Sequence, residues 1–256
     1  MTTILVTGAT GGLGRPTVER LRAAGHDVRA LSRHAGGGRQ AGEGRVVADL
    51  ATGAGLEDAL TGVETVLHLA TTRKSDAAQT LTLLDAARTA GVSHIVYISI
   101  VGVDRIPFAY YRDKAECERL VAESGIPFTI LRATQFHGFV ADLFLATRRL
   151  PFLVTLPVSD QPIAVEEVAD RLAELAETGP SGRVPDIGGP EILTLDELAA
   201  QWQRAHGSHK RVWRVSIPGK TMKAFRAGHH LAGLPGYGRG TFAEYAAHRA
   251  RDTNEA

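Results

Sequence analysis

The stretch TILVTGATGGLG, Thr3–Gly14, decides the fold of this chain. It opens with an apolar run, Thr3–Thr7, of the kind that forms a buried β-strand, and glycines follow at regular spacing. Apolar residues at helical spacing come next, over Pro16–Ala24, and a glycine stops them. The stretch therefore predicts a strand, a tight turn and a helix.

The same alternation of strand and helix continues toward the middle of the chain. The expected strands are apolar throughout, which is typical of a parallel sheet buried on both faces by helical crossovers. We therefore predict an α/β fold, a Rossmann-type doubly wound parallel sheet. Further strands are expected at Asp27–Leu31, Arg45–Ala48, Thr65–Ala70, His94–Ile100 and Pro127–Leu131, and further helices at Gly55–Leu60, Ala77–Ala90 and Tyr110–Ser124.

This rhythm changes after Arg132, where a mostly apolar helical stretch is followed by three closely spaced prolines. We predict a Rossmann domain at residues 1–134 and a small C-terminal substrate lobe at residues 135–256, of which residues 164–190 return to the Rossmann core. The later elements are expected as helices at Phe139–Leu150, Ala164–Thr178 and Thr194–His206 with Thr194 as N-cap, a strand at Arg183–Ile187, and a disordered tail at Arg251–Ala256.

Composition fits one large core and argues against several classes of partner. The chain has 256 residues, 44% of them hydrophobic, and its 29 lysines and arginines balance 28 aspartates and glutamates. This balance creates no field that would attract nucleic acid or anionic lipid. Cys117 is the only cysteine, which indicates a reducing compartment. No targeting segment or membrane-spanning run is found, and the histidines lack metal-ligand spacing, so we expect a cytoplasmic protein without a metal.

The glycine turn has the properties of a phosphate-binding site. Phosphate oxygens reach the amides at a helix N-terminus only where no side chain intervenes, and a tight turn favours residues without a Cβ. The spacing is G-x-x-G-x-x-G and not the G-x-G-x-x-G fingerprint, so the position after the first strand carries the prediction. The alternative is a glycine turn without a ligand. The predicted cofactor-binding residues are Gly8, Thr10, Gly11, Gly12, Leu13 and Gly14.

The end of the second strand indicates which dinucleotide is bound. An acidic residue there would hold the ribose 2′-hydroxyl of NAD, whereas this chain has Ser32 and Arg33. Arg33 can neutralise a 2′-phosphate and stack on adenine, so NADP(H) is favoured and NAD(H) is the alternative. Asp49 and Leu50 could contact the adenine or form an ordinary helix N-cap region. Arg15 could add charge near the 2′-phosphate or be a solvated arginine.

Tyr110 and Lys114 form a candidate catalytic pair because they share one face at the start of a predicted helix. An ammonium beside a phenol favours the phenolate and lowers the barrier to proton transfer at a carbonyl. Ser99, at the end of the fifth strand, could orient that carbonyl by a hydrogen bond. Lys114 could also reach the nicotinamide ribose. Tyr111 is the rival tyrosine, and the alternative for both tyrosines is packing at the start of the helix.

Three segments, TGATGGLG, VYISIVGVDRIPFAYYRDKAECE and TILRATQFHGF, together resemble the atypical short-chain dehydrogenase/reductases, in particular the NmrA-like NAD(P)H-binding group. The resemblance implies NADP(H) binding and reduction of a carbonyl, quinone or imine-like group. It also implies a catalytic triad of Ser99, Tyr110 and Lys114, a cofactor-lining segment with Leu69, Ala70 and Thr71, and a turn that places Thr134 near the cofactor and Gln135, Phe136 and His137 near the substrate.

Two functions follow from these patterns. The leading hypothesis is an NADP(H)-dependent oxidoreductase that transfers a hydride to a carbonyl, quinone or related small-molecule acceptor, with Tyr110 as proton donor and Ser99 positioning the acceptor. The alternative is an NADP(H)-sensing, NmrA-like regulatory protein without turnover. The presence of both Tyr110 and Lys114 favours the enzyme, since regulators of this group often lack the tyrosine.

Overall fold

The computed structural model describes residues 1–33, 44–72 and 74–255, and it divides the chain into two compact units. The first unit comprises Met1–Ser99, Ala109–Arg132 and Val165–Pro185. The second comprises Ile100–Phe108, Ala133–Ala164 and Asp186–Ala256. The chain therefore crosses between the units several times along its length.

A seven-stranded sheet in the order β3-β2-β1-β4-β5-β6-β9 forms the centre of the first unit. Strand β1, third in this order, pairs in parallel with β2 on one side and β4 on the other, so Ile4 faces both Val28 and Thr65. The predicted α/β class with a Rossmann-type sheet is thereby confirmed. The strands are β1 (Thr3–Thr7), β2 (Asp27–Ser32), β3 (Arg45–Val47), β4 (Thr65–His68), β5 (His94–Ile100), β6 (Phe128–Ala133) and β9 (Gly182–Arg183).

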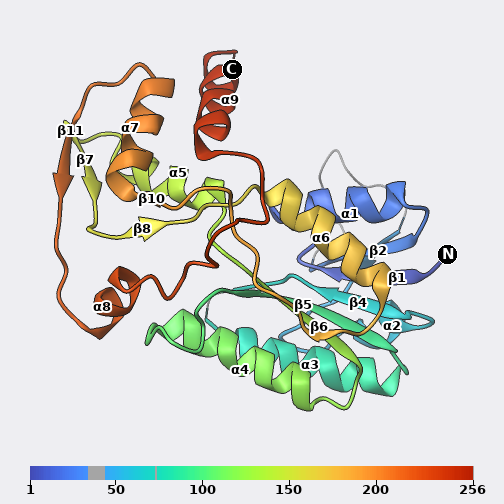
Figure 1. Ribbon diagram of the computed structural model, residues 1–256. Coiled ribbons are helices and arrows are strands. Elements are labelled where there is room, and N and C mark those ends of the chain that lie inside the picture. Colours follow the sequence, from blue (N-terminus) through green and yellow to red (C-terminus); the bar gives the residue numbers. More distant parts are fainter. Residues whose placement is uncertain (34–43, 73, 256) are drawn as a thin grey trace. The chain divides into compact units, whose positions relative to one another are not determined.

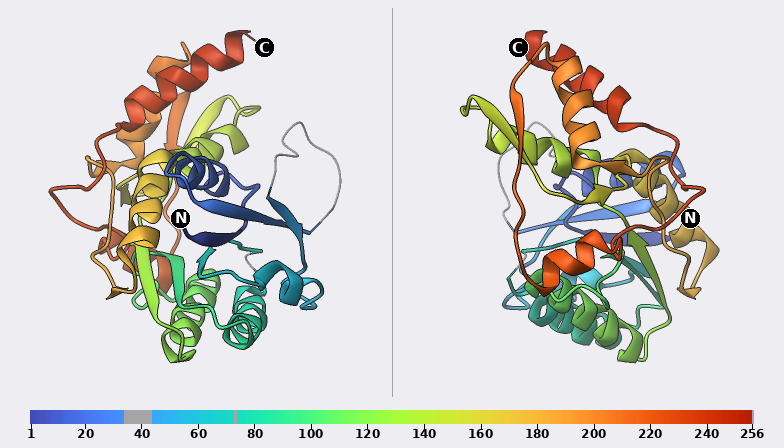
Figure 2. Two further views of the ribbon diagram at one scale, coloured as in Figure 1. Left: turned by 90° about the vertical axis from the view of Figure 1, so that its right-hand side faces the viewer. Right: turned by 60° about the vertical axis from the view of Figure 1, so that its left-hand side comes forward.

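Helices cover both faces of this sheet. Helices α1 (Gly14–Ala23) and α6 (Val165–Thr178) pack against each other on one face, while α3 (Asp76–Thr89) and α4 (Ala109–Glu123) lie side by side on the opposite face (Figures 1 and 2). The short helix α2 (Leu56–Leu60) packs against α3. Right-handed crossovers between parallel strands produce this two-sided arrangement.

The core of the first unit shows why its strands are apolar throughout. Leu5 and Val66 belong to a cluster with α2, α3 and α4, whereas their neighbours Ile4 and Leu67 are equally buried but lie outside that cluster. Successive strand residues point to opposite faces, so both sets of side chains must be apolar when both faces are covered. Burial of these side chains holds the strand ends, and hence the site, in place.

The second unit has its own core, in which Trp202 and Phe242 pack with Phe144. Its helices α5, α7 and α9 contact one another, and two small sheets accompany them, β7 with β11 in parallel and β8 with β10 antiparallel (Figure 1). The elements are α5 (His137–Ala146), β7 (Phe152–Thr155), β8 (Ser159–Asp160), β10 (Leu193–Thr194), α7 (Leu195–Ala205), β11 (Arg211–Arg214), α8 (Lys220–Arg226) and α9 (Phe242–Glu255).

Several boundaries differ from the sequence-based expectation. The strand expected at Arg183–Ile187 is only Gly182–Arg183, and pairing with the end of β6 resumes as a single bridge between Ile187 and Ala133. Within the tail expected to be disordered, residues 251–255 are helical and belong to α9, while Ala256 lies outside the described residues. No helix in residues 1–33, 44–72 and 74–255 is long and apolar enough to cross a membrane.

Candidate active site

The glycine turn requires glycine at two positions for steric reasons. Gly8 has φ of +67°, and a Cβ there would lie 2.8 Å from the amide nitrogen of Ala70. A Cβ on Gly14 would lie 2.1 Å from the carbonyl oxygen of Gly8, whereas a Cβ on Gly12 would meet only open space. The turn therefore packs tightly against the end of β4, and Gly12 leaves the start of α1 uncovered.

The N-terminus of α1 is open and free of competing negative charge. Thr10, Gly11 and Gly12 are exposed, and the first turn of α1 contains no acidic residue. Leu13 is half-buried and supplies no side-chain cap, while Nε of Arg15 donates to the carbonyl oxygen of Thr10 at 3.0 Å. The amide of Arg15 already donates to the carbonyl oxygen of Gly11, but the exposed backbone at Gly12 and the positive end of the helix dipole suit an anion, so this turn fits a dinucleotide phosphate.

The end of β2 carries two cations rather than one. Arg33 is exposed, and Nη2 of Arg45 donates to the half-buried hydroxyl of Ser32 at 2.7 Å. Arg45 was not predicted as a site residue, because it reaches Ser32 only through the pairing of β3 with β2. Of the two proposed adenine contacts, Asp49 accepts the amide hydrogen of Ala51 in a local turn, and Leu50 is buried in the core.

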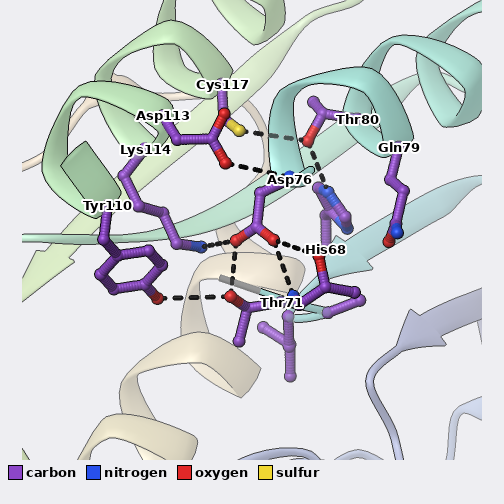
Figure 3. A network of polar contacts seen from close by, with 12 residues as sticks. His68, Thr71, Asp76, Gln79, Thr80, Tyr110, Asp113, Lys114 and Cys117 are labelled. Atoms are coloured by element: carbon purple, nitrogen blue, oxygen red, sulfur yellow. Dashed lines mark hydrogen bonds and ion pairs between the residues drawn. The ribbon is translucent and has the colours of Figure 1, made fainter. Parts of the chain in front are cut away.

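Tyr110 and Lys114 meet the segment after β4 through a chain of polar contacts (Figure 3). The hydroxyl of Tyr110 lies 3.3 Å from Oγ1 of Thr71. The hydroxyl of Thr71 in turn donates to Oδ2 of Asp76 at 2.5 Å. Nζ of Lys114 lies 3.7 Å from the same carboxylate oxygen. The structure thus brings Tyr110, Thr71 and Lys114 together around Asp76, which the sequence did not single out.

Burial shifts the pKa values of the two charged residues in this series of contacts. The side chains of Lys114 and Asp76 are only 4% and 2% exposed. Burial lowers the pKa of Lys114, although the charge of Asp76 opposes that effect. Burial alone would raise the pKa of Asp76, but hydrogen bonds from Thr71 and Thr72 and the charge of Lys114 hold it below its ordinary value. Asp76 is therefore ionised at neutral pH.

A second carboxylate fixes α3 relative to α4. Asp113, on α4, accepts the backbone amide hydrogens of Asp76 at 3.0 Å and Ala77 at 3.4 Å (Figure 3). These amides belong to the first turn of α3, where backbone N–H groups have no partner within the helix. The carboxylate of Asp113 therefore acts as an N-terminal cap supplied by another helix. Asp113 therefore fixes the start of α3, and with it the position of Asp76 beside Lys114.

Ser99 is placed differently from the other two proposed catalytic residues. Its side chain lies at the end of β5 and is 3% exposed. Within the part of the chain that the structure describes, its Oγ has no hydrogen-bond partner. A buried hydroxyl without a partner costs about 1–3 kcal/mol, which makes it a candidate contact for a bound molecule.

The predicted substrate turn belongs to the second unit. The hydroxyl of Thr134 donates to the carbonyl oxygen of Gln161 at 2.5 Å, and Nε2 of His137 lies 3.1 Å from the carbonyl oxygen of Pro162. His137 is buried against aromatic rings, whereas Gln135 and Phe136 are half-buried. The polar groups of Thr134 and His137 thus hold the backbone of their own unit.

Comparisons with known proteins show the family of this chain. A family model described as NAD(P)H-binding matches residues 8–178. Quinone oxidoreductase 2 of Escherichia coli is 30% identical over 245 residues, which are 91% of this chain and 82% of that protein. A (4-alkanoyl-5-oxo-2,5-dihydrofuran-3-yl)methyl phosphate reductase of Streptomyces griseus is 34% identical over 222 residues, which are 84% of this chain and 77% of that protein.

A solved structure extends the likeness over the whole fold. The NADPH-dependent quinone oxidoreductase of Escherichia coli, crystallised with NADPH, superposes with a TM-score of 0.74 at 25% identity, covering 96% of this chain and 99% of that one. The fold and the glycine turn define a Rossmann-type dinucleotide-binding protein. The chain belongs to the NAD(P)H-binding family, and its resemblance to the NmrA-like atypical short-chain dehydrogenase/reductases is confirmed.

Proposed function

We propose that this chain is an NADP(H)-dependent oxidoreductase that reduces a carbonyl, quinone or related small-molecule acceptor, with Tyr110 as the proton donor. The observation that carries the proposal is the contact chain from Tyr110 through Thr71 to Asp76 and Lys114. It lies at the carboxyl ends of parallel strands, where open α/β sheets bind ligands. The relatives named above, a quinone oxidoreductase and a reductase, support the same class of reaction.

The residues present fit a phosphorylated dinucleotide. The exposed backbone at Gly12, beside the start of α1, would hold the pyrophosphate, whereas the amide of Gly11 donates to the carbonyl oxygen of Gly8 at 2.9 Å. Arg33 and Arg45 would hold the 2′-phosphate, so we infer NADP(H) rather than NAD(H). Bound NADPH supplies the hydride. The buried, unpartnered hydroxyl of Ser99 would hold the oxygen of the acceptor.

The contacts of Thr71 determine where the proton of Tyr110 points. Ionised Asp76 can only accept hydrogen bonds, so the single hydrogen of the Thr71 hydroxyl goes to it. Tyr110 therefore donates to Thr71 in the resting enzyme. During reduction the acceptor carbon takes the hydride and its oxygen takes the proton of Tyr110. Thr71 can then turn its hydroxyl toward the phenolate, and the half-buried Tyr110 regains a proton from solvent.

Lys114 supports this arrangement by its charge. Without a buried ammonium at 3.7 Å, the desolvated carboxylate of Asp76 would more readily take up a proton. A neutral Asp76 would no longer compel Thr71 to donate to it. Lys114 thus keeps Asp76 ionised, and the orientation of Tyr110 depends on that charge.

The test compares two neighbouring tyrosines. Tyr110→Phe should lower kcat with carbonyl and quinone acceptors about 100-fold or more and leave the Kd for NADPH unchanged. Tyr111→Phe is the matched control, because Tyr111 is buried at the start of α4 and has no assigned catalytic role. Equal turnover in the two variants would overturn the assignment of Tyr110. A wild-type protein that binds NADPH without reducing any acceptor would favour the regulatory alternative.

A further inference from the structure

A second chain of buried hydrogen bonds lies behind the active site and takes no part in the proton transfer. It runs from Thr7 at the end of β1 to His68 at the end of β4, then to Thr80 on α3 and Cys117 on α4 (Figure 3 shows the last three). The contacts are 2.8 Å from Thr7 Oγ1 to His68 Nδ1, 3.0 Å from His68 Nε2 to Thr80 Oγ1, and 3.4 Å from Thr80 Oγ1 to Cys117 Sγ. All four residues are buried.

The contacts of Thr7 determine the direction of the first hydrogen bond in this series. The hydroxyl of Thr7 accepts the amide hydrogens of Leu69 at 3.1 Å and Ala70 at 3.2 Å. A hydroxyl has two acceptor lone pairs and one hydrogen, so the hydrogen of Thr7 must go to Nδ1 of His68. Nδ1 therefore carries no proton.

The directions of the remaining hydrogen bonds follow from the charge state of His68. Burial, and after it the charge of Lys114, lowers the pKa of His68 to about 3, so the ring is neutral at ordinary pH. A neutral imidazole with an unprotonated Nδ1 has its hydrogen on Nε2, which donates to Thr80. Thr80 in turn donates to the sulfur of Cys117. The opposite tautomer would leave the hydroxyl hydrogen of Thr7 without an acceptor on the ring.

We propose that His68, held in the Nε2–H tautomer, is a positioning residue for the dinucleotide site. Through Thr7 it holds the amides of Leu69 and Ala70, and Ala70 is the residue against which Gly8 packs most closely. Thr71, the partner of Tyr110, follows directly in the chain. The tautomer of one buried ring thereby sets the path of the backbone on which both the phosphate turn and the proton donor depend. This inference rests on the proposed function, because it requires that the turn bind NADP(H).

The first arm of the test observes the tautomer directly. In protein with ¹⁵N-labelled histidine, NMR should show the proton of His68 on Nε2 and an Nδ1 shift typical of an unprotonated nitrogen. The pattern should not change between about pH 5 and pH 8, because the pKa lies well below that range. A proton on Nδ1, or titration within this range, would overturn the inference whether or not the protein binds NADPH.

The second arm separates positioning from general stability with two matched variants. His68→Asn keeps an acceptor near the position of Nδ1 and loses the bond to Thr80, whereas His68→Gln keeps a donor near Nε2 and loses the acceptor for Thr7. Each variant loses one hydrogen bond, so similar Tm losses are expected. We expect the Kd for NADPH to rise about tenfold in His68→Gln and to stay within about twofold of wild type in His68→Asn.

The outcomes separate this inference from the proposed function. Equal losses of NADPH affinity in both variants, in step with their Tm values, would show that His68 only stabilises the fold and would overturn the positioning role. A wild-type protein without measurable NADPH affinity would overturn the proposed function and the positioning role with it, while the NMR spectrum would still report the tautomer. Loss of affinity confined to His68→Gln supports the inference.

Discussion

At the scale of single residues, Gly14 marks where the phosphate turn tolerates no side chain. Its Cβ would collide with the backbone of Gly8 and Ala9, whereas a Cβ on Gly12 would meet open space. Gly14→Ala should therefore lose about 1–3 kcal/mol of unfolding free energy, measured by urea denaturation. Gly12→Ala, the matched control, should unfold within about 0.5 kcal/mol of wild type but bind NADPH more weakly. Equal stability of the two variants would contradict this account of the turn.

A buried carboxyl in the second unit predicts how stability depends on pH. Asp160, on β8, is 6% exposed, its Oδ1 accepts the amide hydrogen of Gln161, and burial raises its pKa to about 6. Between its ordinary pKa and this value the folded protein holds a proton that the unfolded chain has lost. Stability therefore falls as pH rises through this window, by about 1.4 kcal/mol per unit and about 3 kcal/mol in all.

The variant Asp160→Asn isolates this effect, since its amide oxygen can still accept from Gln161. Relative to wild type, it should gain about 3 kcal/mol of unfolding free energy between about pH 3 and pH 7, measured by urea denaturation at several pH values. Other titrating groups cancel in the difference between the two proteins. Parallel stability curves for variant and wild type would show that Asp160 titrates at its ordinary pKa.

At the scale of elements, α7 begins with a complete capping box. The hydroxyl of Thr194 accepts the amide hydrogen of Glu197 at 3.2 Å, and the carboxylate of Glu197 accepts the amide hydrogen of Thr194 at 2.7 Å. Thr194→Ala should cost about 1 kcal/mol of unfolding free energy, while Thr194→Ser should stay near wild type because it keeps the hydroxyl. A loss in the serine variant as large as in the alanine variant would assign the effect to the methyl group instead.

The elements also show where local pattern stops predicting structure. Strands β4 and β5 are predicted close to their observed positions because burial on both faces makes them continuous apolar runs. Strands β7 and β11 pair although they lie far apart in the sequence. Because β11 is exposed along its length, it contains no apolar run from which a strand could be predicted. Propensity and periodicity report local preference, whereas these short strands form through pairing with a distant segment.

At the scale of the whole molecule, cofactor binding should stabilise the fold. NADPH at 100 times its Kd should add about 2.7 kcal/mol of unfolding free energy, measured as a rise in Tm. NADH at the same concentration should add less, because it lacks the 2′-phosphate that Arg33 and Arg45 would hold. Hydrogen exchange should slow at the glycine turn and at Leu69–Thr71. An equal effect of NADH would remove the argument for a 2′-phosphate site.

The sequence by itself determined the features that depend on neighbours in the chain. These are the strand, glycine turn and helix of Thr3–Ala23, the alternation that gives the sheet, and the cap at Thr194. Only the tertiary structure decided that Thr71 contacts Tyr110, that Asp76 pairs with Lys114, and that Thr7 orients His68, because each pair joins different elements. The burial of apolar side chains determines which elements pack together. The free energy of this burial is a sum over many residues, so no single motif predicts it.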